Sequence, residues 1–272
     1  MLSTVFKTLS QTHLDISFAV SPRQQVRIVE APGLWMAPKE LRAFLNQLLE
    51  VAEKTLPTGK LEYGVLSRDK SRLDHSIVTL VTEKSDGTPV AFNALARMDV
   101  DLGHRREDVL HLGLVIVDPH QRSQGLSWVL YGLTCILMLF RNGMRPLWIS
   151  NVTQVPAVVG LVSSGFSRVF AGPDADLRDD RSLALLLLAR RIMKDHRHVF
   201  GVGEDAGFDE ARFVITNAYT GGSDHLKKTY GDAQKHRDSA VNEFCKTELA
   251  YERGDDVLQL GQIDLPTALS YL

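Results

Sequence analysis

The sequence has few cysteines, with only Cys135 and Cys245 among its 272 residues. They lie far apart and have none of the paired spacings that zinc clusters and disulfide frameworks use. The pair His196-x-His198 does not place both rings on one helix face, and no cysteine lies near it in sequence. We therefore predict no metal site and no disulfide framework, and we interpret both cysteines as reduced thiols in a cytoplasmic protein.

Long apolar runs are also missing. The longest are residues 128–140 and 183–189, and both fall short of the roughly 20 residues needed to cross a bilayer. The first twenty residues carry polar side chains throughout, so we expect neither a secretory signal nor a membrane span.

The chain has no large excess of charge of either sign. Its formal net charge is -2, which gives no global reason to expect nucleic acid or an anionic membrane as a partner. A hydrophobic content of 44% and a charged content of 24% are ordinary for a soluble globular protein. With 272 residues, the chain is long enough for one large domain or two small ones.

The most informative stretch runs from residue 111 to residue 140. Leu112–Val117 is apolar and rich in branched residues, which predicts a buried strand, and Pro119 ends it because proline has no amide hydrogen for a ladder. From Gly125 to Phe140 the chain is apolar for too long to be a strand, so we predict a core helix.

Small and polar residues separate the strand from the helix. Residues 122–127 read Arg-Ser-Gln-Gly-Leu-Ser and stand at the start of the predicted helix. Such a helix end attracts phosphate, because unpaired amide groups and the positive end of the helix dipole point the same way. Arg122 adds a positive charge, and Gly125 allows close approach to the backbone. The pattern indicates a site for linked phosphates.

This arrangement resembles the acyl-CoA site of the GNAT superfamily of N-acetyltransferases. The matching residues are Val117-Asp118-Pro119, then Arg122-x-x-Gly125-x-Ser127, with serine replacing the last small residue of the family pattern. A second block, from Asn151 to Gly165-Phe166, resembles the family's next strand and helix in order and spacing. An ordinary strand-turn-helix unit, in which the arginine and glycine only shape a turn, is the alternative.

The resemblance implies an α/β fold with a mixed, mostly antiparallel central sheet flanked by helices, and a helical C-terminal extension. We expect a weakly structured segment at 1–25, an acyl-CoA-binding core at 26–170, and an extension at 171–272 that completes the sheet and covers the acceptor side. Periodicity and turn signals predict individual elements. The expected strands are 26–30, 76–82, 89–98, 147–150, 167–170 and 211–219, and the expected helices begin at 38, 155, 182 and 232, the last ending at Arg253, before Gly254.

For the cofactor, acetyl-CoA or another acyl-CoA, the resemblance implies three contacts. The amides from Ser123 through Gln124, Gly125 and Leu126 to Ser127 would hold the pyrophosphate, together with Arg122. The backbone of Val115, Ile116 and Val117 would pair with the pantetheine arm. Asn151 would bond to the same arm, although an asparagine at a strand end is also a common turn former.

The proton chemistry is less clearly marked. His111 stands at the start of the predicted strand, and the usual pKa of histidine suits a general base at neutral pH, although a histidine at a strand end is more often structural. Glu107 and Asp108 are further candidates, and a chain of waters could replace a dedicated base. The family's usual acid, a tyrosine, is replaced by Leu161. Ser163, Ser164, Tyr131 or the extension would have to supply the proton.

The predicted function is therefore acyl transfer from acyl-CoA to a small-molecule or peptide amine. Two alternatives stay open: synthesis of an N-acyl product from a long-chain donor on CoA or an acyl carrier protein, and a non-catalytic GNAT-like binding or scaffold protein. A homodimer is possible. Gly160, unusual inside a helix, would leave room for a ligand or a close helix contact.

Overall fold

The computed structural model describes residues 11–55, 64–67, 69, 71–121, 126–173, 182–219 and 226–270. The chain folds as two compact units. The N-terminal unit comprises Met1–Arg97, Leu112–Arg145 and Tyr271–Leu272, and the C-terminal unit comprises Met98–His111 and Pro146–Ser270. Strands β4 (Pro89–Asp101) and β5 (Arg106–Val117) have residues in both units. The predicted boundary between a core at 26–170 and an extension at 171–272 stays a prediction.

The N-terminal unit contains an antiparallel sheet with the order β1-β2-β3-β4. Its first three strands are β1 (Asp15–Ala19), β2 (Gln24–Glu30) and β3 (Ser76–Glu83). The strands predicted at 76–82 and 89–98 form the β3–β4 hairpin, and Gly87 adopts the positive φ of 77° that such turns favour. Residues 1–25 were predicted to be weakly structured, but their described part includes strand β1. This strand pairs with β2 and is further held by an ion pair between Asp15 and Arg27.

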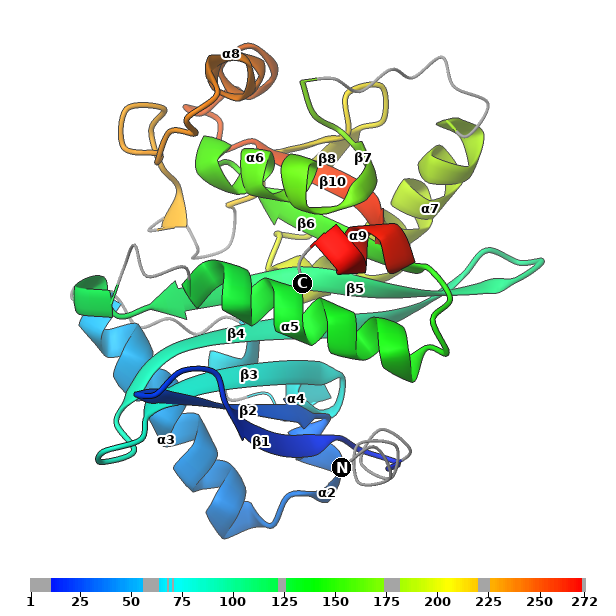
Figure 1. Cartoon of the computed structure of the whole chain (residues 1–272). Coiled ribbons are helices and arrows are strands. Elements are labelled where there is room, and N and C mark those ends of the chain that lie inside the picture. Colours follow the sequence, from blue (N-terminus) through cyan, green and yellow to red (C-terminus); the bar gives the residue numbers. More distant parts are fainter. Residues whose placement is uncertain are drawn as a thin grey trace. The chain divides into compact units, whose positions relative to one another are not determined.

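Helices cover both faces of this sheet (Figure 1). They include α2 (Pro32–Trp35), α3 (Pro38–Thr55), α4 (Ser71–Asp74), α5 (Leu126–Arg141) and the 3-10 turns η1 (Gly64–Leu66) and η2 (Pro119–Gln121). Val78 and Leu80 share an apolar core with Phe44 of α3. Thr79, between them, contacts Thr134 of α5. Because side chains alternate along a strand, α3 and α5 pack on opposite faces.

The C-terminal unit contains a mixed sheet. Its strands are the first half of β5, then β6 (Leu147–Thr153), β7 (Ser167–Phe170), β8 (Gly207–Asp209), β9 (Val214–Thr216) and β10 (Asp256–Ile263). The order is β5-β6-β10-β9-β8, with β7 also paired to β10. β5 and β6 run parallel, whereas β10 is antiparallel to β6, β7 and β9. The predicted fold class, α/β with a mostly antiparallel sheet flanked by helices, is confirmed.

Two strand predictions were wrong in detail. The strand expected at 211–219 is only the short β9, and β10, which the sequence analysis did not predict, pairs along the whole of β6. The predicted strands at 89–98 and 112–117 are both longer than expected, because β4 continues to Asp101 and β5 begins at Arg106. The Asp101 side chain accepts a hydrogen bond from the Gly103 amide at 2.7 Å and closes a tight hairpin there.

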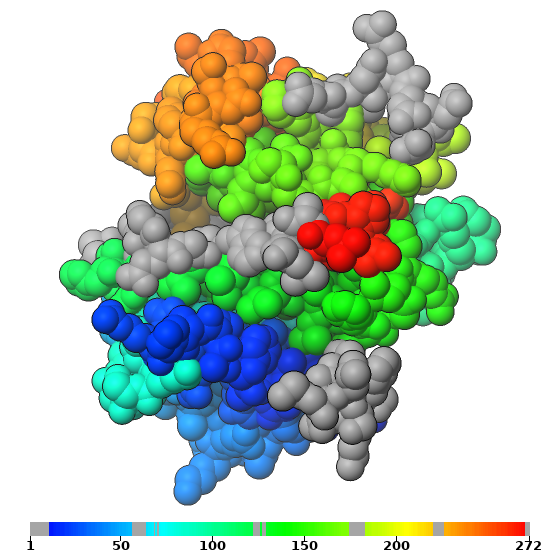
Figure 2. Space-filling model, in the orientation of Figure 1, coloured from blue at the N-terminus to red at the C-terminus, as the bar shows by residue number. Residues whose placement is uncertain are grey.

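The helices of the C-terminal unit are α6 (Pro156–Gly165), α7 (Ser182–Asp195), η3 (Arg197–Phe200), α8 (Ser239–Glu248) and α9 (Leu265–Ser270). The helix predicted from Asp232 to Arg253 was too long. Asp238 caps α8 by accepting a hydrogen bond from the Ala240 amide at 2.9 Å, so the helix starts only at Ser239. The short α9 lies at the surface (Figure 2), with Leu265 and Leu269 exposed.

No helix in the described ranges is both long enough and apolar enough to cross a membrane.

Candidate functional site

The predicted phosphate site lies between two elements of the N-terminal unit. β5 ends at Val117 and α5 begins at Leu126, which is buried. Between them, Asp118 shapes a turn. Its amide donates to the Val90 carbonyl at 2.9 Å, and its carboxylate accepts from the His120 amide at 2.9 Å. The predicted strand and helix are therefore present, and an ordered turn follows the strand.

Most of the predicted pyrophosphate contacts lie outside the described residues. These are Arg122, Ser123, Gln124 and Gly125, and only the backbone of Ser127 is described, within α5. On the strand, Ile116 is buried in the core that α3 covers, whereas Val115 and Val117 are half-buried. The Val117 carbonyl accepts a long hydrogen bond from Thr55 Oγ1 at 3.4 Å. The alternation places Val115 and Val117 on the sheet face opposite α3.

His111 is a core residue of the C-terminal unit. Its side chain is buried, its Nδ1 lies 3.1 Å from Ser150 Oγ, and its ring lies 4.5 Å from the Phe200 ring, between centroids. Burial lowers the pKa of His111 to about 3, because water no longer stabilises the charged ring. The imidazole is consequently neutral at physiological pH.

Glu107 lies four residues earlier on β5 and is partly exposed. Its carboxylate lies 2.7 Å from the guanidinium of Arg105, and the two side chains are 21% and 52% exposed. Both residues belong to the hairpin end of the strand, so Glu107 and His111 occupy different environments although they share one strand.

Asn151 belongs to a buried network of amides in the C-terminal unit. It stands opposite Gln259 in the register of β6 and β10, and its Nδ2 donates to Gln259 Oε1 at 3.0 Å. Gln259 Nε2 in turn donates to the Ala171 carbonyl at 2.9 Å and to Ser163 Oγ at 3.1 Å. Asn151 and Gln259 are almost fully buried. The network ties α6 to two strands, and it occupies Ser163, one of the predicted proton donors.

Helix α6 carries Leu161 where the family pattern has tyrosine, and Gly160 just before it. A Cβ atom built on Gly160 would lie 2.6 Å from the ring of His236, so a side chain there would overlap that ring. Ser164 is also engaged, because its hydroxyl donates to the Gly160 carbonyl at 2.8 Å. Gly160 therefore permits close packing of the non-helical segment before α8, which is neither the ligand space nor the helix contact that its position suggested.

A second buried polar cluster was missed by the sequence analysis. Asp256, at the start of β10, accepts a hydrogen bond from Tyr219 Oη at 3.0 Å. The Tyr219 hydroxyl is also contacted by the side-chain amide of Gln154, whose carbonyl oxygen accepts from the Lys228 amide at 2.9 Å. Burial raises the pKa of Asp256 to about 7, the Tyr219 bond opposes the rise, and the charge of Asp255 adds to it. The only sign of this cluster in the local sequence was the adjacent pair Asp255 and Asp256 before an apolar run.

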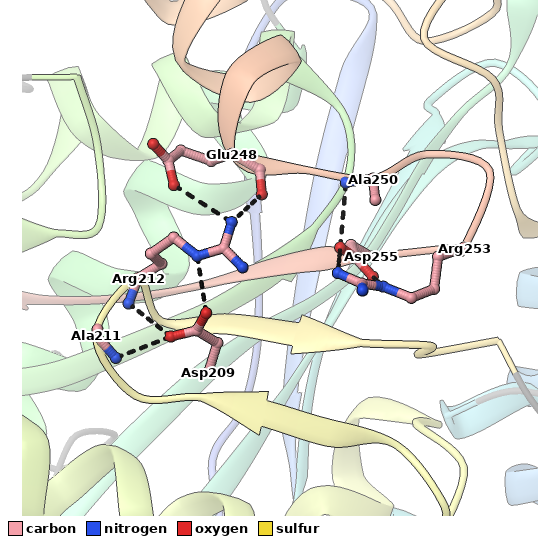
Figure 3. Close-up of polar contacts among 7 residues, drawn as sticks. All are labelled: Asp209, Ala211, Arg212, Glu248, Ala250, Arg253 and Asp255. Atoms are coloured by element: carbon pink, nitrogen blue, oxygen red, sulfur yellow. Dashed lines mark hydrogen bonds and ion pairs between the residues drawn. The ribbon is translucent and has the colours of Figure 1, made fainter.

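Asp255, next to Asp256, is buried in the opposite electrostatic setting (Figure 3). Arg253 Nε and Nη2 donate to its two oxygens at 2.7 and 2.6 Å. The Ala250 and Asn217 amides donate at 3.1 and 3.3 Å. Burial alone would raise the pKa of Asp255, but these four bonds outweigh it and lower the pKa. In the same figure, Arg212 bridges Asp209 and Glu248.

Within the described ranges, no group of three or more His, Cys, Asp or Glu side chains could hold a metal ion. Cys135 and Cys245 are both buried as free thiols.

No protein-family model matches the chain, and no curated protein matches it. Several solved structures are similar to part of it. A ribosomal-protein-S5-alanine acetyltransferase from Vibrio fischeri is 15% identical over 59% of this chain and 88% of its own, with a TM-score of 0.39. A putative acetyltransferase of the GNAT family from Desulfovibrio desulfuricans is 18% identical over 52% and 85%, with a TM-score of 0.36.

An aminoglycoside N-acetyltransferase in complex with CoA is 14% identical over 46% of this chain and 74% of its own, with a TM-score of 0.31. At such identities and TM-scores, these likenesses do not bear on the activity of this chain.

Proposed function

We propose that this chain is a GNAT-type N-acyltransferase, which moves an acetyl or other acyl group from acyl-CoA to an amine. The observation that carries the proposal is the sequence Arg122-x-x-Gly125-x-Ser127, which follows β5 and ends in the first turn of α5. The first amides of a helix have no partners within the helix, so they suit a phosphate.

The residues on both sides of this loop suit a CoA molecule. The loop supplies backbone amides, one guanidinium from Arg122 and a glycine, which together are a donor set for a pyrophosphate. Acyl-CoA would supply an acyl group activated as a thioester, and CoA would leave as the thiol. Val115 and Val117 would present their backbone to the pantetheine arm. Because Asn151 Nδ2 already donates to Gln259 Oε1, Asn151 would contact that arm through its remaining polar groups.

The acceptor amine must lose a proton, and we propose His111 and Glu107 as the candidates to take it. A base works best when its pKa lies near the working pH, so the buried ring of His111 is a poor match in its present environment. Glu107 is partly exposed but is paired with Arg105. Mutation separates the two candidates.

We expect His111→Gln to lower kcat/KM by about 10²–10⁴-fold if the imidazole takes the proton, as general bases contribute this much. Because the pKa of His111 lies near 3, its titration should cause no loss of rate between pH 7.5 and 5.5. Glu107→Gln is the matched variant for the second candidate base, and its kcat/KM is measured in the same way. A His111→Gln protein that loses thermal stability but keeps its kcat/KM would show that the ring is structural.

Thiol release tests the proposed activity. Purified protein is mixed with acetyl-CoA, with longer acyl-CoAs and with a panel of amines and peptides, and free CoA thiol is measured. Release that depends on both protein and amine supports the proposal. A preference for long chains would favour the N-acyl synthase alternative, and CoA binding without release from any donor would favour the non-catalytic one.

A further inference from the structure

Helix α5 packs on the sheet of the N-terminal unit through a surface that is almost entirely apolar. Its sequence from Leu126 to Arg141 is LSWVLYGLTCILMLFR, and Leu130, Cys135 and Leu139 are fully buried. Apolar contact is non-directional, so it holds a helix against a sheet without fixing how far the helix slides or turns. Thr134, which is also fully buried, carries a polar side chain in this surface.

Thr134 meets two polar residues of the sheet, and the hydrogen bonds can be assigned. Thr134 Oγ1 donates to the Leu130 carbonyl at 2.6 Å. It must then accept from Thr79 Oγ1, which lies 2.5 Å away. Asn93 Nδ2 donates to the same Leu130 carbonyl at 2.7 Å, and Asn93 Oδ1 accepts from the Thr79 amide at 3.2 Å.

The three side chains of this network are fully buried, and Thr79 and Asn93 stand opposite each other in the register of β3 and β4. Buried polar groups without partners are costly, so a shift of the helix that broke these bonds would be opposed strongly. The network therefore opposes sliding and turning of α5, which the apolar contacts alone do not fix.

The network lies close to the end of α5 that follows the predicted phosphate loop. Leu130 is four residues after Leu126, which is one helical turn or about 6 Å along the axis. The far end is held separately, because Arg141 Nη2 lies 2.8 Å from Glu30 Oε2 on β2. A slip of one residue would move the first amides by about 1.5 Å and turn them by about 100°. Hydrogen bonds to a phosphate would not survive that displacement.

We propose that Thr134, Thr79 and Asn93 are positioning residues. They fix the position of α5 along its axis and its rotation about that axis, so that its first amides meet the pyrophosphate of CoA. The proposal rests on the proposed function. It deepens that function by assigning a role to residues outside the phosphate loop.

The test compares the affinities of CoA and of pantetheine, which lacks the pyrophosphate and the nucleotide, by calorimetry. We expect Thr134→Val, which keeps the shape and removes the hydroxyl, to weaken CoA binding at least tenfold and to change pantetheine binding less than twofold. Thr134→Ser should restore CoA binding. Val78→Ala truncates a buried side chain on the opposite sheet face, so it should lower stability without separating the two affinities.

The proposal is overturned if Thr134→Val binds CoA as the wild type does, or if both ligands weaken equally. If Thr134→Val does not fold, Thr79→Val removes the same contact from the strand and is measured with the same criteria. Failure of the wild type to bind CoA would instead refute the proposed function, and the positioning role with it.

Discussion

Replacing Asp256 with asparagine is expected to stabilise the protein above pH 7 and to flatten its stability profile below that pH. The Asp256 carboxyl has its pKa raised by burial from 3.8 to about 7 in the folded chain, so the folded state binds its proton more tightly than the unfolded state. Its contribution to stability is therefore full below pH 4, and it is lost as the pH rises to about 7.

The size of the expected change in stability follows from the pKa shift of Asp256. Three pKa units correspond to roughly 4 kcal/mol, at about 1.4 kcal/mol each, as an upper limit. Asparagine carries no charge at any of these pH values and keeps an oxygen for the Tyr219 hydroxyl. Its amide hydrogens must also be buried, so we expect a net gain of about 1–3 kcal/mol at pH 8.5.

Urea denaturation followed by circular dichroism between pH 4.5 and 8.5 measures this difference. The wild-type free energy of unfolding should decline relative to the Asp256→Asn variant across this range. The two curves should cross, because the buried amide hydrogens cost the variant stability at every pH. A variant that is less stable than the wild type at pH 8.5 would mean that the Asp256 carboxylate is stabilising.

Replacing the neighbouring Asp255 with asparagine should have the opposite result, a loss of about 2–4 kcal/mol at neutral pH. All four groups around Asp255 are donors: two nitrogens of Arg253 and the amides of Ala250 and Asn217. An asparagine side chain offers them one oxygen, and it turns its own N–H groups toward two of them. Arg253 is half-exposed, so most of the loss should come from the two backbone amides, whose hydrogen bonds to Asp255 are partly buried.

The pH dependence provides the control. The pKa of Asp255 is lowered by these bonds, so its stabilising contribution exists above the unfolded pKa and disappears as the pH falls through the folded pKa. The penalty of Asp255→Asn should therefore stay constant from pH 8.5 to 4.5 and shrink only below the ordinary aspartate pKa of 3.8, so the denaturation series is extended below that pH to measure it. Equal stability of wild type and variant at pH 7 would refute the assigned role of these bonds.

Local patterns in the sequence predicted much of the fold. The turn residues Asp86 and Gly87 predicted the β3–β4 hairpin, and helical spacing with Pro38 at the start predicted α3. The block ending in Gly165-Phe166 predicted α6, whose last residue is Gly165. In each case the determining interactions lie within a few residues, so they leave a mark on the sequence.

Long-range pairs account for what the sequence did not reveal. β10 is defined by pairing with β6, about a hundred residues earlier, and Asn151 meets Gln259 only through that pairing. The environment of Asp256 likewise depends on Tyr219 and Gln154. The charge state of His111 depends on its burial against Phe200. Residue types alone carry no signal for such neighbours.

The assignment of acyl-CoA chemistry is tested most directly by calorimetric titration of the intact protein with CoA. We expect saturable binding to the wild type, and at least tenfold weaker binding to Gly125→Val, because a branched side chain would keep the pyrophosphate away from the backbone. No heat with the wild type, or equal affinity in the two proteins, would contradict a phosphate site between β5 and α5.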